Sequence, residues 1–149
     1  MIPVRMGVAA LGALALAAVA PALGRPIGDP PPPREDGPPP AWVDTTLGER
    51  WLAFSSYCWV RVCADYIPPS RRRDLPRIVL TRGEIVRFHL GFRPRTVSLI
   101  LGRTTIRLAA GRPAWRVRGR GGAALLAATA PVGDASYAAR LVVRSASGK

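Results

Sequence analysis

Arginine is the residue type whose number and placement in this chain could support chemistry, namely the binding of anions. Between Arg71 and Arg120 there are 14 arginines and only two acidic residues, which gives these 50 residues a net charge of +12. A guanidinium group donates two parallel hydrogen bonds to a phosphate or a carboxylate. A strongly basic protein is also attracted to polyanions, so the charge pattern favours binding over catalysis.

Six arginines are expected to point outward from predicted strands, because apolar residues occupy the alternating inward positions. The candidate anion-binding residues among them are Arg87, Arg107, Arg116 and Arg118, and the other two are Arg140 and Arg144. If their strands are neighbours in one sheet, they form an anion-binding face for lipid headgroups, a wall polymer or an acidic polysaccharide. The alternative is that they are the ordinary polar surface of a sheet. The sequence indicates no specific nucleic-acid partner and leaves the oligomeric state open.

Residues suited to catalysis or metal binding are scarce. His89 is the only histidine, and neighbouring arginines would disfavour its protonated form. Asp65 and Asp74 flank a proline-rich loop and would form a hydrolytic acid–base pair only if the fold brings them together in a cleft. Otherwise they balance the charge of Arg71–Arg73. We therefore predict a protein that is not an enzyme and that binds no metal or cofactor.

The four tryptophans divide into two groups. A buried ring is the usual state of tryptophan in a small domain, and we expect three of them in the core: Trp51, Trp59 and Trp115. Trp42 lies beside a proline-rich segment and is the best candidate for an exposed ring. Exposed rings are typical of carbohydrate-binding modules, which stay an open alternative.

The N-terminus has the pattern of a secretory signal peptide. Met1–Arg5 is short and positive, Met6–Ala20 is an apolar run of 15 residues, and small residues follow. We predict cleavage after Ala22, which assigns residues 1–22 to the signal peptide and places the protein outside the cytoplasm. An uncleaved membrane anchor is the alternative, although a spanning helix needs about 20 apolar residues.

Export changes the meaning of the two cysteines. Cys58 and Cys63 lie close together in the sequence, and in an exported chain we expect them to form a disulfide. The loop they close is short, so the bond would contribute about 2 kcal/mol. It would fasten a local turn rather than hold the domain together.

Half of the 16 residues from Arg25 to Pro40 are proline, which cannot join a helix or a sheet ladder. We therefore predict an extended, solvated linker over residues 23–40. A stalk, or a ligand for a proline-binding groove, is the alternative. The folded domain would then cover residues 41–145, and residues 146–149 would form a tail.

The rest of the chain predicts an all-β fold, because apolar and polar residues alternate and long helical periodicity is absent. Thr96–Leu101 and Thr104–Leu108 form a hairpin around a two-residue turn, in a register that pairs Leu99 with Ile106. Residues 123–130 favour a strand, with a helix as the alternative. Seven or eight short strands are typical of a β-sandwich.

Two segments resemble known proteins. Gly133–Val143 resembles the penultimate or final strand of immunoglobulin-like β-sandwiches, in which a tyrosine hydrogen-bonds back to the preceding corner. The resemblance implies that role for Tyr137 and that fold for the domain. Ser56–Trp59 with Cys63–Tyr66 resembles a motif of small exported bacterial proteins of unknown function. That resemblance implies no activity, and we give Trp59, between the cysteines, a structural role.

The sequence therefore predicts an exported, non-catalytic module that binds an anionic envelope or extracellular partner through an arginine-rich face. The alternative is a structural or chaperone-like domain that contacts a protein through a sheet edge or through its proline-rich tail. A small hydrolase around Asp65 and Asp74 is the third hypothesis.

Overall fold

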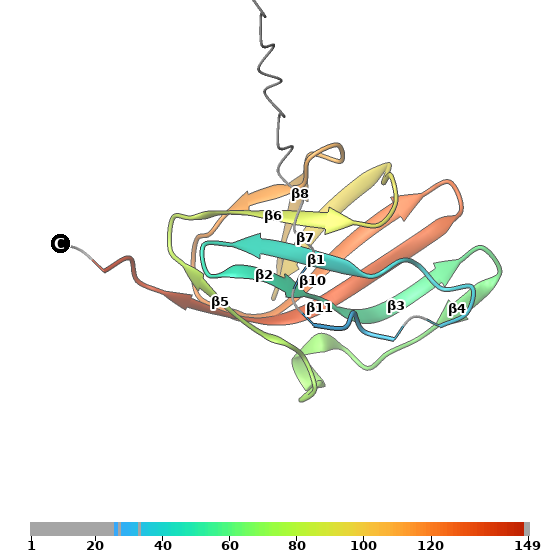
Figure 1. Cartoon of the computed structure of the whole chain (residues 1–149), viewed down its shortest axis with the longest axis horizontal. Helices are drawn as coiled ribbons and strands as arrows, with labels where there is room; N and C mark the ends of the chain where they lie inside the picture. The colour runs from blue at the N-terminus through green and yellow to red at the C-terminus, as the bar shows by residue number, and fades with distance from the viewer. Residues whose placement is uncertain (1–25, 27, 33, 148–149) are drawn as a thin grey trace, which may run out of the picture.

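The computed structural model describes residues 26, 28–32 and 34–147, so the predicted signal peptide lies outside the described residues. These residues form an all-β fold of eleven strands and one short 3₁₀ helix (Figure 1). The elements are β1 (Ala41–Thr45), β2 (Gly48–Trp51), β3 (Ala53–Trp59), β4 (Val62–Ala64), η1 (Pro69–Arg71), β5 (Arg77–Thr81), β6 (Ile85–Leu90), β7 (Thr96–Leu101), β8 (Thr104–Leu108), β9 (Ala114–Arg116), β10 (Gly122–Ala130) and β11 (Gly133–Arg144). Within this part of the chain, no helix has the length and hydropathy needed to span a membrane.

The strands form two sheets that pack face to face. The small sheet has the order β2-β1-β6-β9, and the large sheet has the order β4-β3-β11-β10-β7-β8. β5 pairs in parallel with Arg140–Arg144 of β11, beside the stretch of β11 that pairs with β3. The prediction of an all-β sandwich is confirmed. The strands outnumber the seven or eight expected because the residues before η1 contribute four, two of them only three or four residues long.

Local patterns set the strands where they were expected. The hairpin of β7 and β8 has the predicted register, with Leu99 opposite Ile106. Gly102 has a φ of 58°, which suits the first position of a type II′ turn and which a residue with a Cβ rarely adopts. β10 alternates buried and half-buried residues, so the strand interpretation of residues 123–130 is confirmed.

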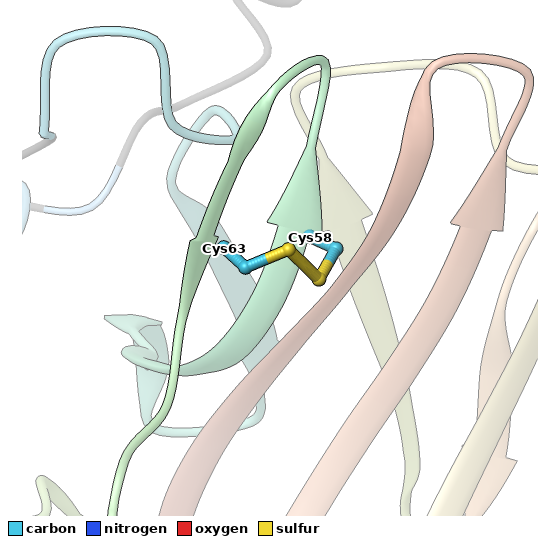
Figure 2. The surroundings of a disulfide bond; sticks show 2 residues. All are labelled: Cys58 and Cys63. Carbon is cyan, nitrogen blue, oxygen red and sulfur yellow. A yellow bond between two sulfur atoms is a disulfide. The ribbon is translucent and has the colours of Figure 1, made fainter.

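The predicted disulfide is present between β3 and β4 (Figure 2). Cys58 and Cys63 are directly opposed in the register of these antiparallel strands. The turn that they enclose carries Val60, whose φ of 54° is unusual for a β-branched residue. The bond therefore closes a hairpin whose backbone is strained at its tip.

The core lies between the two sheets. Its largest fully buried side chains include Tyr137, Ile78 and Leu80. Trp59 and Trp115 are buried, as predicted. The prediction for Trp51 is wrong, because this residue is only half-buried. It lies opposite Trp42 in β1, on the side of the small sheet that faces away from the core.

The end of the predicted linker belongs to the folded domain. Pro38 is fully buried. The carbonyl oxygen of Pro39 accepts a hydrogen bond from the Tyr137 hydroxyl at 2.6 Å. A Cβ on Gly91 would lie 2.5 Å from the Pro39 side chain, so the two segments are in close contact. The boundary at residue 41 therefore falls too late.

The same hydrogen bond corrects the role that the resemblance implied for Tyr137. The hydroxyl does not bind back to the corner that precedes β11; its partner lies 98 residues earlier in the chain. The reason is the position of β11 in the interior of the large sheet, where the tyrosine faces the core and reaches the N-terminal segment. Tyr137 thus fastens that segment to the sandwich.

We expect Tyr137→Phe to lower the free energy of unfolding by about 1–3 kcal/mol, because it leaves the partly buried Pro39 carbonyl without its donor. Tyr57→Phe is the matched control, since the Tyr57 hydroxyl is buried and has no partner among the described residues. Removal of the Tyr57 hydroxyl should change the free energy of unfolding by less than about 0.5 kcal/mol, or should raise it. Urea denaturation measures the free energy of unfolding of both variants. Equal losses of stability in the two would contradict a stabilising role for the hydrogen bond between Tyr137 and Pro39.

Burial raises the pKa of the Tyr137 hydroxyl well above its usual value. The folded state therefore keeps this proton at a pH where the unfolded chain, with a tyrosine pKa of about 10, releases it. The resulting stability is complete below pH of about 10 and is lost as the pH rises towards the folded-state pKa. Urea denaturation from pH 9 to 11 should show this loss in the unmodified chain and in Tyr57→Phe. Tyr137→Phe should lack it.

Candidate anion-binding site

One end of the sandwich gathers turns from both sheets. The β1–β2 and β5–β6 turns, the β9–β10 loop and the end of β11 lie at the left of Figure 1, where the C-terminus leaves. Hydrogen bonds join them: among others, the Arg82 amide donates to the Arg144 carbonyl at 2.8 Å, and the Gly83 amide donates to the Val117 carbonyl at 2.9 Å. The β7–β8 turn joins this end, because Gly102 lines the same groove as Arg120.

Six exposed arginines come from these turns, and we name this set the basic end. They are Arg82, Arg103, Arg116, Arg118, Arg120 and Arg144. Two of the predicted anion-binding residues, Arg116 and Arg118, belong to it. Arg87 lies on the outer face of the small sheet, and Arg107 lies on β8, at the edge of the large sheet. The four predicted arginines therefore do not share one sheet.

The basic end keeps a large excess of positive charge, and no carboxylate forms an ion pair with its guanidinium groups among the described residues. Glu84 is the one acidic residue in its turns, and its two carboxylate oxygens accept hydrogen bonds from the backbone amides of Thr81 and Thr46. The Arg116 guanidinium donates instead to the Gly83 carbonyl at 2.9 Å. Among the described residues, the side-chain contacts between a basic residue and a carboxylate are the Arg72–Asp74 ion pair and the His89–Asp44 contact, so none involves the basic end. Its guanidinium groups keep donors and charge for an external anion.

Arg72 shows the opposite arrangement. Its guanidinium is buried, donates to both carboxylate oxygens of Asp74 at 2.9 and 3.0 Å, and donates to the Phe54 carbonyl at 2.6 Å. The hydrogen bonds from Arg72 hold the pKa of the Asp74 carboxyl below its usual range. Asp65 is exposed, and no hydrogen bond joins it to Asp74 in the described part of the chain. Asp74 is thus engaged by Arg72, and Asp65 contributes nothing to this contact.

A second cluster, which the sequence interpretation missed, lies on the outer face of the small sheet. The rings of Trp42 and His89 stack with centroids 5.0 Å apart, and Trp51 meets Trp42 edge-on at 5.5 Å. His89 Nε2 lies 2.6 Å from an oxygen of Asp44. We expected arginines to be the charged neighbours of His89, but the structure also places a carboxylate beside it. β1 and β6 are distant in sequence, so only their pairing reveals this contact.

Glu49 completes this cluster. It lies directly opposite Asp44 in the pairing of β1 with β2. Partial burial and the negative charge of Asp44 raise the pKa of the Glu49 carboxyl. The cluster thus holds two neighbouring carboxyl groups, of which Glu49 retains its proton more strongly than an isolated glutamate.

The tryptophans of this cluster are not an open platform for a sugar. The indole nitrogen of Trp51 donates to the Gly28 carbonyl at 3.3 Å, so the N-terminal segment contacts this ring. The indole nitrogen of Trp42 is buried. The prediction that Trp42 exposes its ring is therefore met only in part, since the residue is half-buried. The carbohydrate alternative loses the flat, accessible rings that it requires.

Comparisons of the chain with models of protein families, with curated proteins and with solved structures found no match.

We expect Asp44→Asn to lower the pKa of Glu49 towards its ordinary value, because the substitution removes the neighbouring negative charge. The part of the shift that partial burial causes should remain. Titration of the Glu49 carboxyl carbon by NMR measures the change. Asp134→Asn, at an exposed aspartate of β11, is the control and should leave this pKa in place. A Glu49 pKa that rises in Asp44→Asn would contradict the interpretation.

Proposed function

We propose that the protein is an exported, non-catalytic module that docks onto an anionic, phosphate-bearing surface of the cell envelope through its basic end. The observation that carries the proposal is the gathering of six exposed arginines among turns whose one acidic residue is engaged by backbone amides. Guanidinium groups suit phosphate because they donate paired hydrogen bonds in a planar geometry.

The size of the expected attraction is sufficient for docking. A basic residue close to an anionic membrane surface contributes about 1 kcal/mol, and the contribution falls off within a Debye length of about 8 Å at physiological salt. Several arginines at one end act together on a flat surface, whereas arginines spread over the whole molecule would not. Affinity should therefore depend strongly on salt and on which arginines are present.

Two further features support this function. Leu47 in the β1–β2 turn and Ile85 at the start of β6 expose 57% and 46% of their surfaces near the basic end. Apolar side chains beside basic ones are favourable at a membrane interface. The disulfide between Cys58 and Cys63 is compatible with a protein outside the reducing cytoplasm. The predicted signal peptide would supply the route of export.

A protein-interaction function is the second candidate, and one observation favours it. Val60 and Val132 expose 65% and 51% of their surfaces in adjacent turns of β3–β4 and β10–β11. The Val60 amide donates to the Val132 carbonyl at 2.8 Å, so the two side chains stand on neighbouring turns. An apolar tip of this kind would bind a protein in a manner that salt does not weaken.

The test compares two triple variants of the full chain that carry the same net charge. Arg82→Gln, Arg118→Gln and Arg144→Gln together remove half of the basic end, whereas Arg61→Gln, Arg93→Gln and Arg95→Gln remove exposed arginines from turns outside it. On vesicles containing phosphatidylglycerol, the first triple should bind about 100-fold more weakly and the second less than about threefold more weakly. Residues 1–25 are the same in both triple variants and in the unmodified chain, so any contribution of this apolar segment to vesicle binding cancels in the comparison.

Elution from phosphocellulose provides the second arm. A phosphate polymer should release the first triple at a clearly lower salt concentration than the second. Weaker binding to vesicles with unchanged elution would identify lipid headgroups as the source of the phosphate. Equal losses in the two triples, or vesicle binding that salt leaves unchanged, would contradict docking through the basic end.

A further inference from the structure

One strip of the outer face of the large sheet, along β10 and the end of β7, is apolar, whereas a solvated sheet face is normally polar. Arg140 of β11, directly opposite Ala123, lies exposed beside this strip. The outward residues of β10 include Ala123, Leu125 and Ala127, and all three are half-buried. Leu125 lies directly opposite Ile100 of β7, which points to the same face. The segment Gly122–Ala130 contains no charged residue. This strip therefore has the composition of a covered surface, with positive charge beside it.

A groove of about 490 Å³ lies on this face. Its floor is formed by Ile100, Ala123 and Leu125, and its rim includes Pro69 of η1 and the turn residue Gly102. Sites for small molecules have volumes of about 300–1,000 Å³ and walls that are mainly apolar, so this groove has the size and lining of such a site.

Arg120 also lines the groove, and it directly precedes Gly121 and Gly122, which lead into β10. A Cβ on Gly121 would lie 2.1 Å from the Leu141 carbonyl oxygen, so only glycine allows the loop to pass this close to β11. Arg103 directly follows the rim residue Gly102 in the β7–β8 turn and is exposed. No acidic residue is among the described residues that line the groove. The groove thus joins an apolar floor to positive charge from the basic end.

We propose that this groove binds one anionic amphiphile of the lipid class, with its apolar chain on the floor and its phosphate at Arg120 and Arg103. The proposal rests on the proposed function, since such a molecule is a component of the surface onto which the basic end docks. Inorganic phosphate alone would leave the apolar floor uncovered, and an uncharged hydrocarbon would leave the two guanidinium groups without a partner. An amphiphile meets both requirements because it carries both groups in one molecule.

The experiment uses isothermal titration calorimetry of the full chain with monomeric lysophosphatidylglycerol. Lysophosphatidylcholine tests the need for net negative charge, and glycerol 3-phosphate tests the headgroup alone. We expect binding of lysophosphatidylglycerol that is at least tenfold tighter than that of lysophosphatidylcholine, and no measurable binding of glycerol 3-phosphate. Equal affinity for the two lipids, or binding of the headgroup alone, would overturn the proposal.

Ala123→Phe should fill the groove and weaken lysophosphatidylglycerol binding at least tenfold. Ala127→Phe is the matched control, because Ala127 lies on the same face of β10 but does not line the groove. Arg120→Gln should weaken binding of lysophosphatidylglycerol and leave that of lysophosphatidylcholine unchanged. If Ala123→Phe binds the amphiphile as tightly as Ala127→Phe, the groove is not its site.

The experiments distinguish a failure of the groove proposal from a failure of docking through the basic end. Ala123→Phe keeps every arginine of the basic end, so its elution from phosphocellulose should match that of the unmodified chain. Loss of amphiphile binding with unchanged elution supports both proposals. Unchanged amphiphile binding in Ala123→Phe with normal elution would overturn the groove and retain the basic end.

Discussion

The electrostatic imbalance at one end of the sandwich is the constraint on which the functional account depends. Guanidinium groups stay charged at every physiological pH, and the turns that carry them offer one carboxylate, Glu84, which already accepts from two backbone amides. Backbone carbonyls such as that of Gly83 hold individual guanidinium groups without removing their charge. Like charges at this density oppose folding, and a bound anionic surface would relieve that repulsion. Binding and stability should therefore be linked at this end.

The rest of the fold provides a rigid support for this end. Tyr137 fastens the N-terminal segment to the core through Pro39, and the disulfide closes the hairpin at the tip of β3 and β4. Arg72 shows what the fold does with an arginine that it needs for structure: the side chain is buried and bound by Asp74 and a carbonyl. The arginines of the basic end are exposed and are not paired with a carboxylate among the described residues. This difference distinguishes them from an arginine that the fold uses for its own stability.

Sequence patterns predicted those features that depend on neighbours along the chain. The β7–β8 hairpin, the strand at residues 123–130 and the disulfide follow from turn residues, alternation and spacing. The contact of His89 with Asp44 did not follow, because β1 and β6 are 40 residues apart and alternation gives the side of a strand but not its neighbour. The same limit explains why Arg107 was grouped with arginines of the other sheet, and why Trp51 was expected in the core.

The most direct test of the account is an NMR titration that follows the side-chain nitrogen signals of every arginine as tripolyphosphate is added. We predict shifts concentrated in the arginines of the β5–β6 and β7–β8 turns, the β9–β10 loop and the end of β11. Arg61, Arg93 and Arg95 should respond weakly. Equal shifts over all exposed arginines would show that the anion is attracted by net charge without preferring any one site. That result would contradict a localised basic end.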